Sequence, residues 1–158
     1  MLPLSESSDS TAVGDDGLNL YLTCRQMHLA DDPLLRYQYL RDFERDMQSL
    51  DEQYNFLTSG RGYVSRKHEG DKLLVFERGG LLWVINFHPT KSFADYRVGV
   101  EREGKYKMVL NSDAKRYDGH DRLDESVVSY TTPGDWDGRG HSLMVYIPSR
   151  VGIVLHRL

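Results

Sequence analysis

The chain has 158 residues, a formal net charge of −4 and one cysteine. This length suits one domain with its own hydrophobic core, but a (β/α)8 barrel needs about 250 residues. One cysteine excludes an internal disulfide and a cysteine-rich metal site, and the acidic balance argues against a general nucleic-acid binder. Since residues 1–16 lack the basic and apolar regions of a signal peptide, and no apolar run approaches ~18 residues, we expect a cytoplasmic protein without a membrane partner.

The first part of the chain is predicted to be disordered or irregular over residues 1–23, because serine, aspartate and glycine dominate it. A helical segment is predicted over residues 24–60. Asp31, Asp32 and Pro33 are typical of a helix start, since a carboxylate accepts hydrogen bonds from unpaired N–H groups and proline gives up a donor that has no partner there.

An apolar stripe follows that start. Its spacings of three and four residues predict one face of an amphipathic helix that ends between residues 51 and 55. The stripe consists of Leu40, Phe43, Met47, Leu50, Tyr54 and Leu57. This face either packs on the rest of the chain or belongs to a partner.

The remainder, residues 61–158, is predicted to be a β-domain. Gly79 and Gly80 join two apolar runs and indicate a two-residue hairpin turn. Eight short apolar segments without an intervening helix favour an antiparallel sandwich or barrel. The expected strands cover residues 63–68, 72–78, 81–87, 96–100, 106–110, 127–131, 142–147 and 151–155, and residues 133–140 are expected to be a turn.

No set of residues in the sequence has the spacing of a catalytic, metal or cofactor motif. The six histidines form no ligand pair, and His88 before Pro89 is expected to be structural or part of a turn. An acidic loop could supply calcium ligands, although a solvated polar loop is the more frequent explanation. Its acidic residues are Asp113, Asp118, Asp121, Asp124 and Glu125.

The aromatic residues are more informative, because a sugar ring stacks on an exposed aromatic ring while polar neighbours bind its hydroxyls. Trp136 lies among turn residues between Asp135 and Asp137, so it could stack on a sugar; alternatively, it folds back onto the edge of the sandwich. The weaker candidates are Tyr117, Phe93 and Tyr96.

Several segments resemble the C-terminal region of 1,4-α-glucan branching enzymes. Residues 43–47, FERDM, and 50–54, LDEQY, are similar to the last barrel helix of that family. Residues 86–99, NFHPTKSFADYRVG, carry the most specific resemblance, which covers about residues 25–158 in order. Further matching segments are residues 63–69, 75–79, 112–122 and 145–150.

The resemblance implies a mainly β fold, an antiparallel β-sandwich of the α-amylase C-terminal type preceded by one long amphipathic α-helix. The family belongs to the α-amylase superfamily and transfers an α-1,4-glucan chain to a 6-hydroxyl to form an α-1,6 branch. Its aspartate nucleophile, glutamate acid/base and further aspartate lie in the barrel, and no position here matches those motifs. The chain alone is therefore expected to be inactive and to need no cofactor.

The same resemblance implies the partners. The stripe Leu40, Phe43, Met47 and Leu50 would face the catalytic barrel, or mediate self-association where the barrel is absent. The sandwich can contact an α-glucan, glycogen or starch, through its surface aromatic residues. Two other hypotheses stay open, namely a free-standing glucan-binding module without catalytic activity and a protein-interaction β-sandwich.

Overall fold

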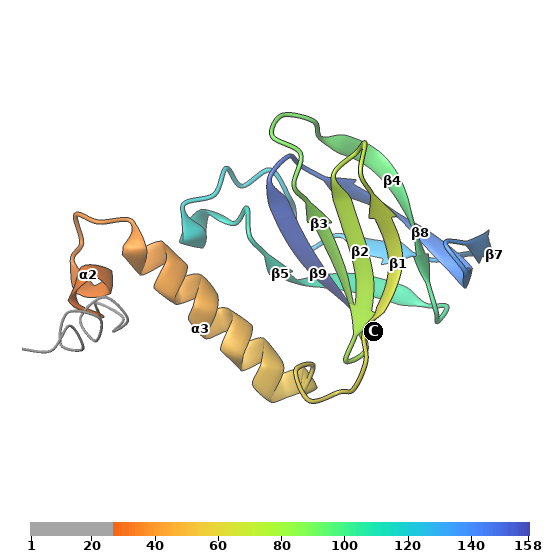
Figure 1. Ribbon diagram of the computed structural model, residues 1–158, viewed down its shortest axis with the longest axis horizontal. Helices are drawn as coiled ribbons and strands as arrows, with labels where there is room; N and C mark the ends of the chain where they lie inside the picture. The colour runs from red at the N-terminus through yellow and green to blue at the C-terminus, as the bar shows by residue number, and fades with distance from the viewer. Residues whose placement is uncertain (1–26) are drawn as a thin grey trace, which may run out of the picture.

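The computed structural model describes residues 27–158. The predicted irregular segment 1–23 and the first residues of the predicted helical segment lie outside this range. The described part consists of helices α2 (Met27–Asp31) and α3 (Tyr37–Tyr54) and a two-layer β-structure. Figure 1 shows α3 beside one layer, on the side away from β4 and β8.

The two layers are antiparallel sheets, which confirms the predicted sandwich. The six-stranded sheet has the order β1 (Tyr63–His68), β2 (Leu73–Arg78), β3 (Leu81–Asn86), β9 (Val151–Arg157), β5 (Lys105–Asn111) and β6 (Val128–Tyr130). The three-stranded sheet has the order β4 (Phe93–Val100), β8 (Arg139–Ile147) and β7 (Thr132–Trp136). A short 3-10 helix, η1 (Lys115–Tyr117), follows β5.

Strand β3 is apolar from Leu81 to Ile85 because both of its faces are covered. Leu82 and Val84 belong to the core between the two sheets, whereas Leu81 and Trp83 belong to a second core beneath α3. Successive side chains of a strand point to opposite faces, so a strand that is covered on both faces needs apolar residues at every position.

Helix α3 packs on the outer face of the six-stranded sheet through its middle and its end. Leu50 is only 6% exposed, and Phe43, Met47 and Tyr54 are half-buried around it. Leu40, at the other end of the predicted stripe, is 54% exposed. Neither described helix has the length and apolar character needed to cross a membrane.

The predicted start of the helix is wrong by about one turn. Helix α3 begins at Tyr37, and Arg36 before it provides no side-chain cap. Asp32 instead accepts the N–H of Leu34 (2.9 Å) in the turn between α2 and α3. An aspartate followed by proline suits a tight turn as well as a helix start, so the pattern alone does not separate the two. The predicted end is confirmed, with Asn55 in the left-handed conformation.

The hairpin at Gly79 and Gly80 is confirmed, with φ angles of 62° and 73°. The expected turn over residues 133–140 is wrong, because it contains β7 and the beginning of β8. Pro133 and Gly134 gave this segment the composition of a turn. Strand β7 lies at the edge of its sheet, where a proline that lacks an N–H is tolerated.

Candidate functional site

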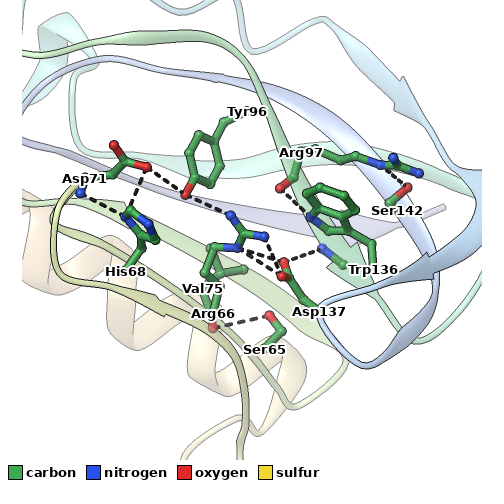
Figure 2. Close-up of polar contacts among 11 residues, drawn as sticks. Ser65, Arg66, His68, Asp71, Val75, Tyr96, Arg97, Trp136, Asp137 and Ser142 are labelled. Atoms are coloured by element: carbon green, nitrogen blue, oxygen red, sulfur yellow. Dashed lines mark hydrogen bonds and ion pairs between the residues drawn. The ribbon is translucent and has the colours of Figure 1, made fainter.

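Three of the four predicted aromatic candidates lie in one series of contacts at an edge of the sandwich. Phe93 and Tyr96 on β4 form an edge-to-face pair, with ring centres 5.1 Å apart. The guanidinium carbon of Arg66 on β1 is 5.5 Å from the ring centre of Tyr96 and 5.3 Å from that of Trp136. Figure 2 shows Arg66 between Tyr96 and Asp137, with Trp136 close to that pair.

Arg66 and Asp137 connect the two sheets at this edge. Arg66 Nε donates to both carboxylate oxygens of Asp137 (3.0 Å each), and Nη2 donates to Oδ1 (2.6 Å). The two side chains are 24% and 10% exposed. The hydrogen bond to Asp137 raises the pKa of Arg66, although burial opposes this shift. A guanidinium in this geometry is a positioned structural cation, because its donors are engaged with the Asp137 carboxylate and the Tyr96 hydroxyl.

Asp71 extends this network toward the turn between β1 and β2. The hydroxyl of Tyr96 accepts from Arg66 Nη1 (3.2 Å) and donates to Asp71 Oδ2 (3.4 Å). The ammonium of Lys91 lies 3.2 Å from Asp71 Oδ1, and His68 Nδ1 lies 3.1 Å from Oδ2. Burial alone would raise the pKa of Asp71, but the hydrogen bond from Lys91 and the electrostatic effect of His68 lower it.

Trp136 is half-buried and folds back onto the sandwich. Its Nε1 donates to the carbonyl of Arg97 (3.0 Å), and the guanidinium carbon of Arg97 is 4.5 Å from the indole centre. Gly99 makes this approach possible, since a Cβ atom there would lie 2.2 Å from the carbonyl oxygen of Trp136. The indole ring thus contacts two arginines through cation–π geometry.

Tyr117 belongs to a different part of the molecule. Its ring meets Phe43 of α3 edge-to-face at 5.2 Å, and its hydroxyl donates to Asp46. Burial raises the pKa of Tyr117, with the hydrogen bond to Asp46 adding to the effect of burial. These contacts fasten η1 to the helix, away from the Arg66 network.

The acidic loop after β5 is organised around Asp113. Its carboxylate accepts the N–H groups of His120 (3.2 Å) and Arg122 (3.0 Å), and also the guanidinium of Arg122 (2.9 and 3.0 Å). Asp124 accepts the N–H and the hydroxyl of Ser126. Among residues 27–158 no three His, Cys, Asp or Glu side chains lie close enough to hold a metal ion. The carboxylates of Asp113 and Asp124 therefore hold the loop in its conformation by accepting hydrogen bonds from within it.

The comparison with protein families matches residues 63–157 to the family described as alpha amylase, C-terminal all-beta domain. The chain belongs to this family. It is also 54% identical over 131 residues to the 1,4-alpha-glucan-branching enzyme of Rhizophagus irregularis and 55% identical over 131 residues to that of Saccharomyces cerevisiae. The enzyme of Felis catus is 49% identical over 134 residues.

These alignments cover 83% to 85% of the chain but only 19% of each relative. The chain therefore spans about one fifth of the length of the curated relatives that it matches. The resemblance to branching enzymes that the sequence indicated is confirmed.

The segment 86–99 contains a set of side-chain hydrogen bonds that hold two loops of the all-β domain together. Asn86 Nδ2 donates to the carbonyls of Lys91 and Pro148 (2.9 Å each), while its Oδ1 accepts the N–H of His88 (2.9 Å). His88 Nδ1 in turn accepts the N–H groups of Thr90 (3.2 Å) and Lys91 (2.8 Å). The predicted structural role of His88 is confirmed.

The central residues of the network, Arg66 and Asp137, were not predicted from the sequence. Asp137 and Gly138 form the two-residue turn between β7 and β8, with φ angles of 55° and 71°. An Asp-Gly pair is a hairpin signal and could have indicated this turn. No sequence signal joins Arg66 to Asp137, because their contact depends on how the two sheets are stacked.

Proposed function

We propose that this chain acts as the C-terminal domain of a 1,4-α-glucan branching enzyme and supports a catalytic barrel carried elsewhere in that enzyme. The identity of 49–55% to branching enzymes over most of the chain carries this proposal. The described residues contain partly buried ion pairs and hydrogen-bonded loops that stabilise a domain. The proposed contribution to branching is structural, with the chemistry performed by the barrel.

The first half of α3 is the proposed contact with the barrel. Tyr37 and Leu40 of α3 are 53% and 54% exposed, and Leu34, in the turn before α3, is 90% exposed. Beside them lies a hollow of about 320 Å³ that Leu40 and Phe43 line from α3 and Tyr117 lines from η1. Three neighbouring exposed apolar residues next to a hollow are typical of a surface that another domain covers. Self-association through the same surface is the alternative.

The contact is tested in the complete enzyme with Leu40→Asp, using Met144→Asp as the matched control. Both residues are about half exposed, but Met144 lies on β8 of the opposite sheet. We expect Leu40→Asp to reduce branching activity in an iodine-stain assay and to lower the temperature at which the enzyme inactivates. Equal behaviour of the two variants would contradict this docking surface, and branching by the 158-residue chain alone would contradict the structural role.

Glucan contact is a second proposed function, supported by the contact series of Phe93, Tyr96 and Trp136. Phe93 and Tyr96 are half-buried and keep part of their surface in solvent. Co-sedimentation of the chain with glycogen tests this contact. Phe93→Ser is the test variant, and Tyr117→Phe, at the aromatic candidate that lies away from this edge, is the control. Loss of sedimentation in Phe93→Ser alone supports glucan contact at this edge, whereas equal sedimentation of both variants contradicts it.

A cytoplasmic location is part of the same proposal, supported by the single cysteine of the chain. Fractionation of cells that produce the protein tests this location. Recovery in the secreted or membrane fraction would contradict it.

A further inference from the structure

One end of the sandwich holds a pocket of about 450 Å³ whose lining is rich in arginine. The β2–β3 turn, the segment after β4 and the end of β9 meet there. The lining includes five arginines, Arg61, Arg78, Arg102, Arg139 and Arg157, which we call the arginine pocket. Only two carboxylates line it, so it carries three more positive than negative charges, in a chain whose net charge is −4.

Arg139 takes up both of those carboxylates. Its Nε lies 2.8 Å from Glu77 Oε1, and its Nη1 forms an ion pair with Glu101. Its guanidinium carbon also lies 3.6 Å from the ring centre of Tyr63. Arg139 and its two carboxylates thus form a fixed wall of the arginine pocket with one net negative charge, and the other four arginines carry the positive charge that exceeds it.

Those four arginines have no carboxylate partner among residues 27–158. Arg78 Nη2 donates to the carbonyl of Leu57 (2.8 Å), and Arg157 Nη1 donates to the carbonyl of Glu103 (3.2 Å), so these two are positioned without being neutralised. The guanidiniums of Arg61 and Arg102 have no hydrogen bond or ion pair within the described part of the chain. Both side chains are exposed and are available to a ligand.

The hydroxyl of the buried Tyr106 lies beside the pocket. It donates to the carbonyl of Arg102 (2.9 Å) at the side of the pocket. Burial and the charge of Glu77 raise the pKa of Tyr106, while the charges of Arg157 and Arg102 act in the opposite direction. Charges of both signs, those of Glu77, Arg157 and Arg102, therefore act on this hydroxyl.

Like charges that outnumber their counter-charges repel one another, and a bound anion relieves that repulsion. The planar donor fork of a guanidinium matches phosphate oxygens better than it matches a monoatomic anion. A volume of this size is within the range that accommodates a small organic molecule. We propose that the arginine pocket binds a small phosphate-bearing anion, either inorganic phosphate or the phosphate monoester of a sugar.

Isothermal titration calorimetry of the 158-residue chain in 0.15 M NaCl tests this proposal with inorganic phosphate, glucose 6-phosphate and glucose. We expect saturable binding of at least one phosphate compound and none of glucose. The double variant R61Q/R102Q should weaken that binding about tenfold or more, since it removes two charge-assisted donors. Arg45→Gln, which removes an exposed arginine of α3 outside the pocket, should leave the affinity unchanged.

The two phosphate sources are distinguished by their relative affinities. Tighter binding of glucose 6-phosphate indicates that the sugar also contacts the pocket, and equal binding indicates recognition of the phosphate alone. Backbone NMR shifts of the unmodified chain during titration give a second readout that does not depend on folding of the variant. They should move at residues 101–106 and 157.

Absence of saturable binding, equal weakening by Arg45→Gln, or NMR shifts confined to other regions would each overturn the proposal. These measurements contain no branching assay, so their failure is independent of the proposed role as a branching-enzyme domain.

Discussion

Asn86 is only 1% exposed, and it begins the segment 86–99 on which the resemblance to branching enzymes was based. Its amide satisfies backbone groups from two loops that meet at one end of the sandwich. Leucine or isoleucine would fit the neighbouring apolar pattern of β3 but would leave those groups unpaired. The role that the structure gives to Asn86 is therefore to hold two loops together.

Asn86→Ala is expected to lower the free energy of unfolding by about 3 kcal/mol, because it leaves the buried carbonyl of Pro148, the partly buried carbonyl of Lys91 and the N–H of His88 without their partner. Urea denaturation monitored by tryptophan fluorescence measures this loss. Asn86→Asp keeps the acceptor for His88 but turns a carboxylate oxygen toward backbone carbonyls at a buried site, so it should destabilise the fold at least as much. A change below about 0.5 kcal/mol in Asn86→Ala would contradict this role.

The pKa of Asp113 links the acidic loop to pH. Burial raises this pKa, but the hydrogen bonds from Arg122 and from the N–H of His120 outweigh burial and lower it below its usual value. Because the folded-state pKa is the lower one, Asp113 stabilises the fold fully above the unfolded-state pKa of about 3.9, and this contribution is lost as the pH falls further.

Asp113→Asn should therefore reduce stability at neutral pH and flatten the dependence of stability on pH below about pH 4. Urea denaturation from pH 2.5 to pH 7 measures both effects. The control is Asp95→Asn, which changes an exposed carboxylate on β4. An unchanged acid dependence in Asp113→Asn would show that other groups control acid unfolding.

Among the elements, α3 best shows what the sequence can and cannot predict. The spacing of its apolar residues predicted the helix and its end, because periodicity is a local property. It did not predict that Leu50 is buried by the sheet while Leu40 is exposed, since both have the same place in the pattern. That difference depends on where the helix crosses β3 and β9.

Leu50→Ala should cost about 2–4 kcal/mol of unfolding free energy, because it opens a cavity against Trp83 and its neighbours. Leu40→Ala is the matched control and should cost less than about 1 kcal/mol in the chain alone. Thermal denaturation of the two variants compares the sites directly. Similar losses would mean that the helix packs along its whole length in solution.

In the β-domain too, strand β7 and the Arg66 network could not be predicted from local sequence patterns. The strands with apolar runs were predicted because each run is continuous, whereas β7 has the composition of a turn and depends on pairing with β8. Trp136 was expected either to be exposed or to fold back. The structure places it against Arg97 and against Arg66, which lies 70 residues earlier in the chain, so no local pattern could decide between the two.

At the scale of the whole molecule, the Arg66–Asp137 pair connects sheets that share no backbone pairing at this edge. Arg66→Ala or Asp137→Ala should each cost about 3 kcal/mol or more, since each change leaves a mostly buried charge without its partner. A double-mutant cycle by urea denaturation measures their coupling. The exposed Arg45–Asp42 pair of α3 is the control, with expected coupling of about 0.5 kcal/mol or less.

The strand order of the larger sheet has a consequence for how the chain acquires its structure. Strand β9 lies between β3 and β5, drawn in blue in the middle of the sheet in Figure 1. Until residues 151–157 have left the ribosome, β1–β3 and β5–β6 have no strand to join them. The hairpins can form early, but the sheet must assemble in one late step around a strand from the opposite end of the domain, and such long-range pairing is intrinsically slow. During that delay the open edges of β3 and β5 resemble the unpaired edges on which aggregation begins.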